Sequence, residues 1–217
     1  MSVDSTQAYM PGVVRDDLPP LASGGLLRAY GPLVYLAMRL RTGDDPAKDP
    51  GTFRSTTVDR LNKCRNMALQ MGFHKVEVED ADYAVCSLLD ETVLMRAGAL
   101  RDAWVVRTLQ LERYGSERGG ERFFELLRGE GLSGSPRAEL LELYLLCLMA
   151  GFTGKYQGDP ARLKRLTEGV QQALEQSLAR RRENLLCRSK PRSRRKKFGA
   201  QTCHRRSLLR RPASSLL

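Results

Sequence analysis

The segment that most limits how this chain can fold runs from Leu140 to Ala150, where Glu142 is the one strongly polar residue. A helix that is apolar on almost every side has to be buried on almost every side. The segment is also much shorter than the roughly 20 apolar residues that a membrane span requires. It therefore predicts the central helix of a soluble helical domain over residues 137–150, with Ser135-Pro136 at its start and Gly151 at its end.

Helical periodicity continues along most of the remaining chain, and no segment alternates as a strand would. The other expected helices cover about residues 26–41, 57–71, 80–94, 103–114 and 119–128, and a long one begins at Asp159-Pro160. Together these segments predict an all-α fold of about seven helices.

Local signals set the expected helix boundaries. Gly31-Pro32 marks a break or restart within the first helix. Thr42–Arg54 carries loop-forming residues throughout, and Thr56 is the expected N-cap of the second helix. The apolar residues of the last helix recur three or four apart, which predicts one buried face made by Leu163, Leu166, Val170, Leu174 and Leu178.

The excess of positive over negative charge is confined to the C-terminal end of the chain. The chain has 36 Lys and Arg against 25 Asp and Glu, a net charge of +11. Residues 188–217 hold 11 of those basic residues and no acidic one, so residues 1–187 balance at 25 of each sign. A neutral body argues against nucleic-acid binding by the folded part of the protein.

The composition divides the chain into three parts. Residues 1–24 are polar and rich in proline, so we expect a disordered segment that is not a signal peptide. Residues 25–186 are expected to form the helical domain. Residues 187–217 are a basic low-complexity tail that cannot bury enough apolar surface to fold. No run of apolar residues predicts a transmembrane helix in the chain as given.

The residue types required for common catalytic and metal sites are sparse. The chain has two histidines, His74 and His204, and neither belongs to a nucleophile motif. Its five cysteines form no Cys-x-x-Cys pair, and Cys64, Cys86 and Cys147 lie on apolar helical faces, as reduced thiols do. We therefore expect no catalytic residues, no metal, no cofactor and no enzyme activity.

Two pairs of neighbouring residues and one single acidic residue remain as candidate sites. Asp90 and Glu91 are adjacent on an apolar helix and point about 100° apart, so they do not form an acid/base pair. They either cap or pair with neighbouring elements, or contact a partner. Glu121 follows Gly119-Gly120 at a helix start, where it would repel a phosphate, which favours a structural role. Lys155-Tyr156 is either an exposed turn with Tyr156 folded onto the core or a binding element.

Four blocks in the chain resemble the DotU/TssL family of bacterial secretion proteins. They are residues 83–94 (Tyr-Ala-Val-Cys-Ser-Leu-Leu-Asp-Glu-Thr-Val-Leu), 119–124 (Gly-Gly-Glu-Arg-Phe-Phe), 142–148 (Glu-Leu-Tyr-Leu-Leu-Cys-Leu) and 151–156 (Gly-Phe-Thr-Gly-Lys-Tyr). Residues 113–117 depart from the Phe-His-Gly-Glu-like sequence that many relatives carry before the second block. The resemblance covers residues 25–182. The departure at residues 113–117 weakens any role that the resemblance would assign to that loop.

The resemblance implies a two-lobed, hook-like helical domain that acts as a scaffold of a type VI secretion system. Its implied partners are a TssM/IcmF-like membrane-complex protein, a TssK-like baseplate protein and a second copy of the chain, at the cytoplasmic face of the bacterial inner membrane. A type IVB IcmH/DotU component shares the domain and is an alternative. A basic nucleic-acid-binding protein acting through the tail is an alternative from another class.

The resemblance also suggests partner-contact residues. In the family, the Leu-Asp-Glu sequence lies at a cleft between helical subdomains, which assigns partner binding to Asp90 and Glu91, and with them to Glu121, Lys155 and Tyr156. At least one of Asp90 and Glu91 is then expected to be exposed. Changing both to lysine would alter stability by no more than about 1 kcal/mol, as at other surface positions.

The tail admits three interpretations: a non-specific nucleic-acid arm, a polybasic membrane-surface segment, or a product of a shifted reading frame. The family continues from its last helix into a membrane span, so we favour the third. We expect the coding DNA downstream of Leu186 to encode a hydrophobic segment of about 20 residues in another frame. Sequencing that region tests this, and finding no such segment, together with salt-resistant membrane association of the chain, would contradict it.

Overall fold

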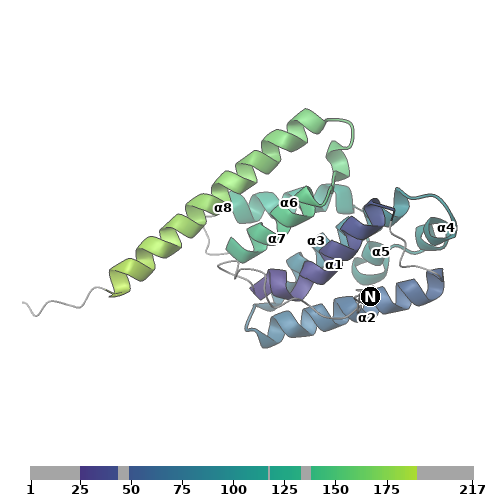
Figure 1. Ribbon diagram of the computed structural model, residues 1–217, viewed down its shortest axis with the longest axis horizontal. Helices are drawn as coiled ribbons and strands as arrows, with labels where there is room; N and C mark the ends of the chain where they lie inside the picture. The colour runs from purple at the N-terminus through teal and green to yellow at the C-terminus, as the bar shows by residue number, and fades with distance from the viewer. Residues whose placement is uncertain (1–24, 44–48, 117, 133–137, 190–217) are drawn as a thin grey trace, which may run out of the picture.

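The computed structural model describes residues 25–43, 49–116, 118–132 and 138–189, and these residues contain helices and no strand (Figure 1). The predicted all-α class is confirmed. The elements are α1 (Gly25–Arg41), α2 (Pro50–Gln70), α3 (Lys75–Leu94), α4 (Ala99–Val105), α5 (Leu109–Tyr114), α6 (Gly119–Leu132), α7 (Ala138–Met149), the 3-10 helix η1 (Gly154–Tyr156) and α8 (Pro160–Ser189). The expected cap Ser135-Pro136 and the segments 1–24 and 190–217 lie outside the described residues.

Helix α2 begins seven residues earlier than predicted. Asp49 is its N-cap, with a side-chain oxygen that accepts a hydrogen bond from Thr52 N at 2.7 Å, and Pro50 occupies the first turn. Thr56 therefore lies inside the helix, and the predicted loop over Thr42–Arg54 is too long. Asp-Pro is itself a helix-start signal, which the loop-like composition around it concealed.

Two further boundary predictions were wrong. The expected helix over 103–114 is two short helices, because Thr108 caps a new start by accepting a hydrogen bond from Leu111 N at 3.2 Å. The expected break at Gly31-Pro32 is absent, since α1 continues through Pro32. Proline disturbs a helix interior, but burial of the α1 face holds the helix together here.

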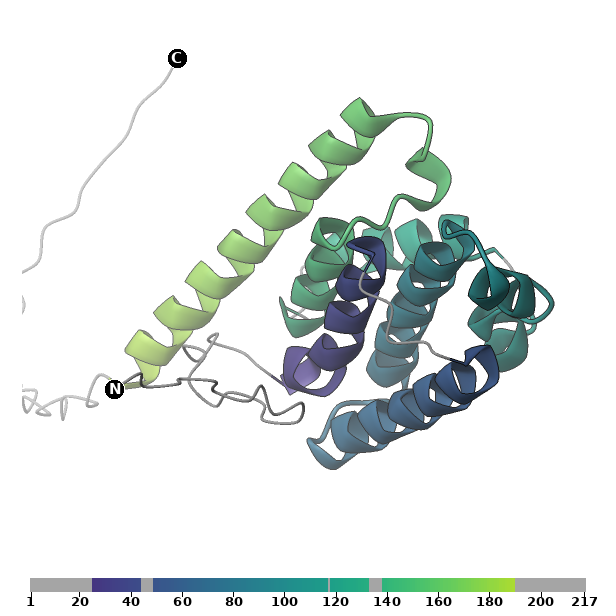
Figure 2. The same cartoon turned by 45° about the vertical axis from the view of Figure 1, so that its right-hand side comes forward.

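Two groups of helices share α1 and α3, in agreement with the expected two-lobed arrangement. Helices α2, α4 and α5 contact this central pair on one side, and α6 and α7 contact it on the other. Helix α8 packs on α7 and η1. Figures 1 and 2 show α2 along one edge of the molecule and α8 along the opposite edge.

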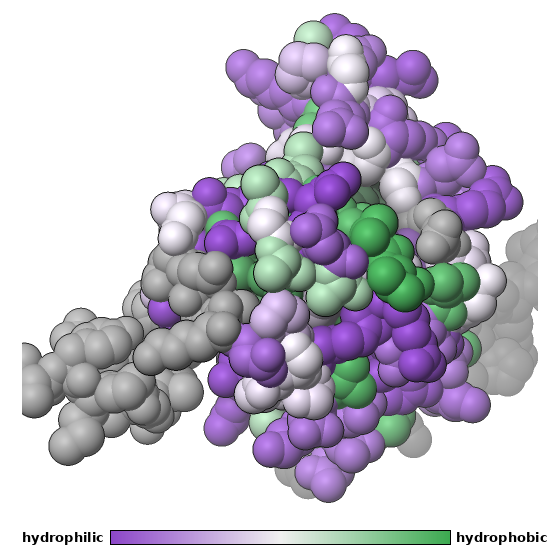
Figure 3. All heavy atoms as spheres, turned by 90° about the vertical axis from the view of Figure 1, so that its right-hand side faces the viewer, coloured by the Kyte–Doolittle hydropathy of each residue, from purple (hydrophilic) through white to green (hydrophobic). Residues whose placement is uncertain are grey.

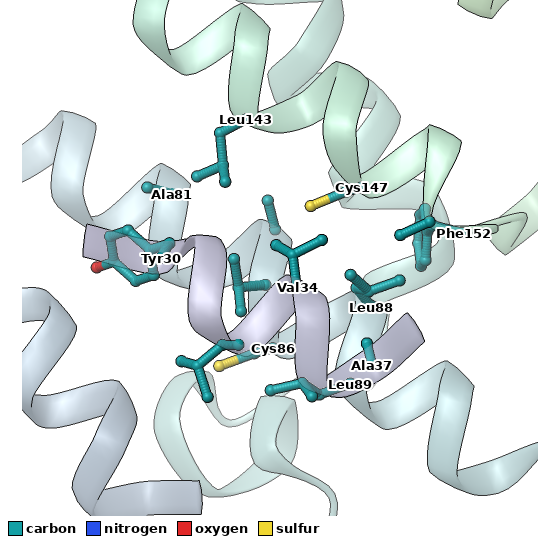
Figure 4. Packing of buried hydrophobic residues seen from close by; sticks show 14 of the residues in the cluster. Tyr30, Val34, Ala37, Ala81, Cys86, Leu88, Leu89, Leu143, Cys147 and Phe152 are labelled. Atoms are coloured by element: carbon teal, nitrogen blue, oxygen red, sulfur yellow. The ribbon is translucent and has the colours of Figure 1, made fainter. Parts of the chain in front are cut away.

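One continuous apolar core runs through both groups (Figure 4). Residues of α1, α3 and α7 converge in it, and Leu143 and Cys147 of α7 are fully buried. The prediction that this helix is central and buried on almost every side holds only in part, because Met149 is 70% exposed and α7 lies on one side of α1 and α3. Phe123, Phe124 and Trp104 are buried as well. Aromatic rings fill the α6–α7 side, where the centroids of Phe123 and Phe152 lie 4.3 Å apart. Such ring pairs stabilise a core beyond their buried area.

Helix α8 presents the predicted apolar face to α7. Val170 and Leu174 are buried, while Leu163, Leu166 and Leu178 are partly buried against the same core. The helix continues to Ser189, so the expected start of the tail at residue 187 lies within it. Among the described residues, no helix combines the length and the apolar character that crossing a bilayer demands.

Cys64, Cys86 and Cys147 are buried and unpaired. Burial raises the pKa of the Cys64 thiol to about 11 and also raises the pKa values of Cys86 and Cys147. Their thiols are therefore protonated at neutral pH and act as small apolar side chains rather than nucleophiles. The described part of the chain holds no cluster of three or more potential metal-ligating side chains.

Candidate functional site

Asp90 is buried within α3 and closes the loop between α4 and α5. Its Oδ1 accepts hydrogen bonds from Trp104 Nε1 and Leu109 N, both at 2.8 Å, and its Oδ2 accepts one from Gln110 N at 2.9 Å. The two backbone N–H groups belong to the first turn of α5 and have no acceptor within that helix. Burial raises the pKa of Asp90 above its usual range, and these N–H donors act in the opposite direction.

Glu91 holds a different loop, the one that leads into η1. Its Oε1 accepts hydrogen bonds from Thr153 N at 2.9 Å and Thr153 Oγ1 at 3.0 Å, and its Oε2 accepts one from Gly154 N at 2.7 Å. Arg41, at the end of α1, pairs with the same carboxylate at 3.1 Å. The carboxylate thus joins three separate segments of the chain.

The expectation that Asp90 or Glu91 is exposed was wrong. Asp90 is 2% exposed and the Glu91 side chain 16%. Neighbouring side chains on a helix diverge by about 100°, so the two carboxylates meet backbone donors of different helix groups. Both are structural, and changing both to lysine would disrupt the fold rather than leave stability unchanged.

The turn at η1 rests directly on the start of α6. A Cβ atom on Gly120 would lie 3.3 Å from Lys155 N, and one on Gly154 would lie 2.9 Å from the Gly120 carbonyl oxygen. Gly154 also has a φ of +48°, which favours glycine. The structural interpretation of Gly119-Gly120 is confirmed, because α6 starts at Gly119 and its backbone approaches η1 closely.

Above this contact, three of the five predicted site residues come together. Lys155 Nζ lies 5.4 Å from the centroid of the Tyr156 ring, and Arg162 Cζ lies 5.5 Å from it. Glu121 is exposed and pairs with Arg118 at 2.7 Å. The Arg118 hydrogen bond, and more weakly Lys155, lower the pKa of Glu121. We call Arg118, Glu121, Lys155, Tyr156 and Arg162 the η1 surface.

Tyr156 folds onto the core, one of the two possibilities that the sequence left open. Its ring packs edge-on against the buried Phe124 at a centroid distance of 4.7 Å, while the residue stays partly exposed beside Lys155. Sequence reasoning missed Arg118 and Arg162. The spacing of Arg118 three residues before Glu121 was an available signal for the first, whereas only the packing of α8 on η1 brings Arg162 to Tyr156.

The stretch at 113–117 that departs from the family pattern has a structural role where it is described. Arg113 Nε and Tyr114 Oη donate to Oδ2 of the fully buried Asp82, at 2.9 Å and 2.8 Å. Burial raises the pKa of Asp82, and Arg113 opposes that shift. Arg113 and Tyr114 thus neutralise and solvate a core carboxylate, which gives no support to a binding role for this stretch.

Comparisons with known proteins agree with this architecture. The model of the DotU family, described as type VI secretion system protein DotU, matches residues 25–215 and so includes most of the basic tail. The cytoplasmic domain of TssL from Acinetobacter baumannii is similar at 32% identity with a TM-score of 0.67, over 70% of this chain and 98% of that one. SciP/TssL from enteroaggregative Escherichia coli 042 is similar at 27% identity with a TM-score of 0.59, over 70% and 86%. The comparison with curated proteins found no match.

Proposed function

Because the chain belongs to the DotU family of type VI secretion system proteins, we propose that it is a non-enzymatic scaffold that links the inner-membrane complex to the baseplate through protein–protein contacts. The domain would lie at the cytoplasmic face of the inner membrane; the similar structure from Acinetobacter baumannii is itself a cytoplasmic domain of TssL. The family is described as a type VI secretion system protein, and the similar Escherichia coli structure is a type VI TssL. Both descriptions favour a type VI component over the type IVB alternative.

The observation that carries the proposal is the fixed position of the η1 surface. Glu91 accepts three hydrogen bonds from Thr153 and Gly154, directly beneath Lys155 and Tyr156. A loop that is already ordered loses little conformational freedom on binding, so more of the contact energy appears as affinity. A partly exposed tyrosine beside the exposed Arg162 also matches the residue types that are enriched at protein interfaces.

We assign this surface to a TssK-like baseplate protein. The TssM/IcmF-like membrane protein and a second copy of the chain are assigned to other faces. Lys155 and Arg162 flank the Tyr156 ring and favour a partner segment that carries carboxylates beside an apolar side chain. No chemistry other than recognition is required of these residues.

The Lys155→Glu, Tyr156→Ala double variant should bind the purified baseplate partner at least about 10-fold more weakly, because it removes an aromatic anchor and reverses a charge. The midpoint of thermal unfolding should fall only modestly, since Lys155 is exposed and the Tyr156 ring is only partly buried against Phe124. The dissociation constant of the full chain, measured by calorimetry, tests this. Lys63→Glu, an exposed lysine of α2, is the matched control for charge.

If Lys63→Glu lowers the affinity as much as the double variant does, the effect comes from the overall charge of the protein. The η1 surface is then excluded as the binding site. Full binding by the double variant would exclude it as well. Salt-dependent DNA binding by residues 1–187 alone would favour the nucleic-acid alternative, which the balanced charge of those residues argues against.

A further inference from the structure

A pair of valines projects from the loop that Asp90 closes. Val105 is the last residue of α4 and is 51% exposed. Val106 follows it and, at 78%, is the most exposed large hydrophobic side chain in the described part of the chain. We call these two residues the valine tip. Their side chains add nothing to the core, so their exposure has no folding advantage.

The valine tip is held from both sides. Trp104 precedes it and Leu109 follows the loop, and both are buried. Both also donate to the same oxygen, Asp90 Oδ1, at 2.8 Å. Within the loop, Arg107 N donates to the Trp104 carbonyl at 3.1 Å. The buried Asp90 carboxylate therefore fixes the loop that carries the two valines, as Glu91 fixes the loop that leads into η1. Such an ordered loop loses little conformational freedom on binding.

The charged residues around the valine tip are mainly basic. Arg101 lies one helical turn before Val105 and pairs with the exposed Asp102 at 3.7 Å. On the other side, Arg107 and Arg54 share the single carboxylate of Glu112, at 3.5 Å and 2.5 Å. Three arginines thus stand against two carboxylates. Such a rim complements acidic side chains on a binding partner.

The valine tip and the η1 surface lie at the same end of the molecule. In both Figures 1 and 2, α4 and the N-terminal end of α8, which follows η1, are at the end opposite to the C-terminal end of α8. Figure 3 views this end and shows hydrophobic residues gathered in the middle of a largely hydrophilic face. One partner surface can therefore face both elements.

We propose that the valine tip is a second docking element for the baseplate partner, inserted into an apolar pocket with acidic side chains at its rim. This inference rests on the proposed function and specifies how the partner is bound, through two preorganised loops at one end of the domain. Two valines are too small an area for a stable dimer of this chain, which needs about 800 Å² from each copy. A bilayer is disfavoured because α8 carries the C-terminal end of the described chain away from the tip.

The Val105→Ser, Val106→Ser double variant should weaken binding of the purified baseplate partner by about 10-fold to 100-fold, as loss of a central apolar contact does. The loss should be equal at about 0.1 M and about 1 M salt, whereas the loss caused by Lys155→Glu should shrink at high salt. Val76→Ser is the matched control, because Val76 is 57% exposed at the start of α3. Circular dichroism of each full-length variant confirms that the helices are retained.

The outcomes separate the two proposals. If Lys155→Glu weakens binding and the valine variant binds fully, the valine tip is not a docking element and the proposed function stands. If the unchanged chain does not bind the partner, both proposals fail. Equal weakening by Val76→Ser, or tip-dependent sedimentation of the chain with anionic phospholipid vesicles, would also overturn the assignment of the tip to the baseplate partner.

Discussion

Replacing Asp90 with alanine should lower the free energy of unfolding by about 3–5 kcal/mol. The change leaves the Trp104 indole N–H and the backbone N–H groups of Leu109 and Gln110 buried without acceptors. Each such orphaned donor costs about 1–3 kcal/mol, and partial relaxation keeps the sum below the maximum. Urea unfolding followed by circular dichroism measures the loss.

Two further variants test whether the loss of stability is specific to the Asp90 carboxylate. Asp59→Ala removes an exposed carboxylate from α2 and should change stability by less than about 0.5 kcal/mol. Asp90→Asn should be intermediate, because its amide oxygen still accepts hydrogen bonds while its NH₂ group faces a donor. A loss below about 1 kcal/mol in Asp90→Ala would mean that Asp90 is not the acceptor that closes the α4–α5 loop.

Replacing Gly154 with alanine should cost about 2–3 kcal/mol and displace η1. The new Cβ would lie 2.9 Å from both the Gly120 carbonyl oxygen and Phe124 Cε2, and the residue has a φ of +48°. The first contact is with backbone, so η1 or the start of α6 has to move. The positive φ adds about 1 kcal/mol of strain. Thermal and urea unfolding measure the total cost.

Two glycines separate these causes. Gly115 has a φ of +64° with nothing near its Cβ position, so Gly115→Ala reports conformational strain alone. Gly158 has no positive φ and no near neighbour, so Gly158→Ala should be nearly neutral. If Gly154→Ala costs no more than Gly115→Ala, the close contact between η1 and α6 is unimportant. If it costs more, partner binding through Lys155 and Tyr156 should fall with it.

The helices and the core could be predicted because their signals are local. The apolar run from Leu140 to Ala150 had to be largely buried, and α7 is, although α1 and α3 rather than α7 are the central helices and Met149 is 70% exposed. The spacing of Leu163 to Leu178 predicted which face of α8 packs, and that face is covered. Such patterns can be read from the sequence because the apolar residues that one helix buries recur at helical spacing within that helix.

Helix boundaries were less predictable, since a start signal competes with the loop-forming tendency of the same residues. Asp49-Pro50 begins α2 within a stretch whose composition indicated a loop. Thr108 begins α5 within a stretch whose apolar pattern indicated one continuous helix. In both cases a single side chain that accepts an N–H of the first turn decided the outcome.

The sequence by itself determined the all-α class, the apolar helix α7 as part of the core and the family to which the chain belongs. The tertiary structure alone decided the structural roles of Asp90 and Glu91, which accept hydrogen bonds from the backbone of Leu109 and Gly154. The same holds for the gathering of Glu121, Lys155 and Tyr156. The physical reason is that a carboxylate takes its role from the donors it meets, and here those donors lie 19 and 63 residues away along the chain. Only the folded arrangement of α3, α5 and η1 brings them within hydrogen-bonding distance.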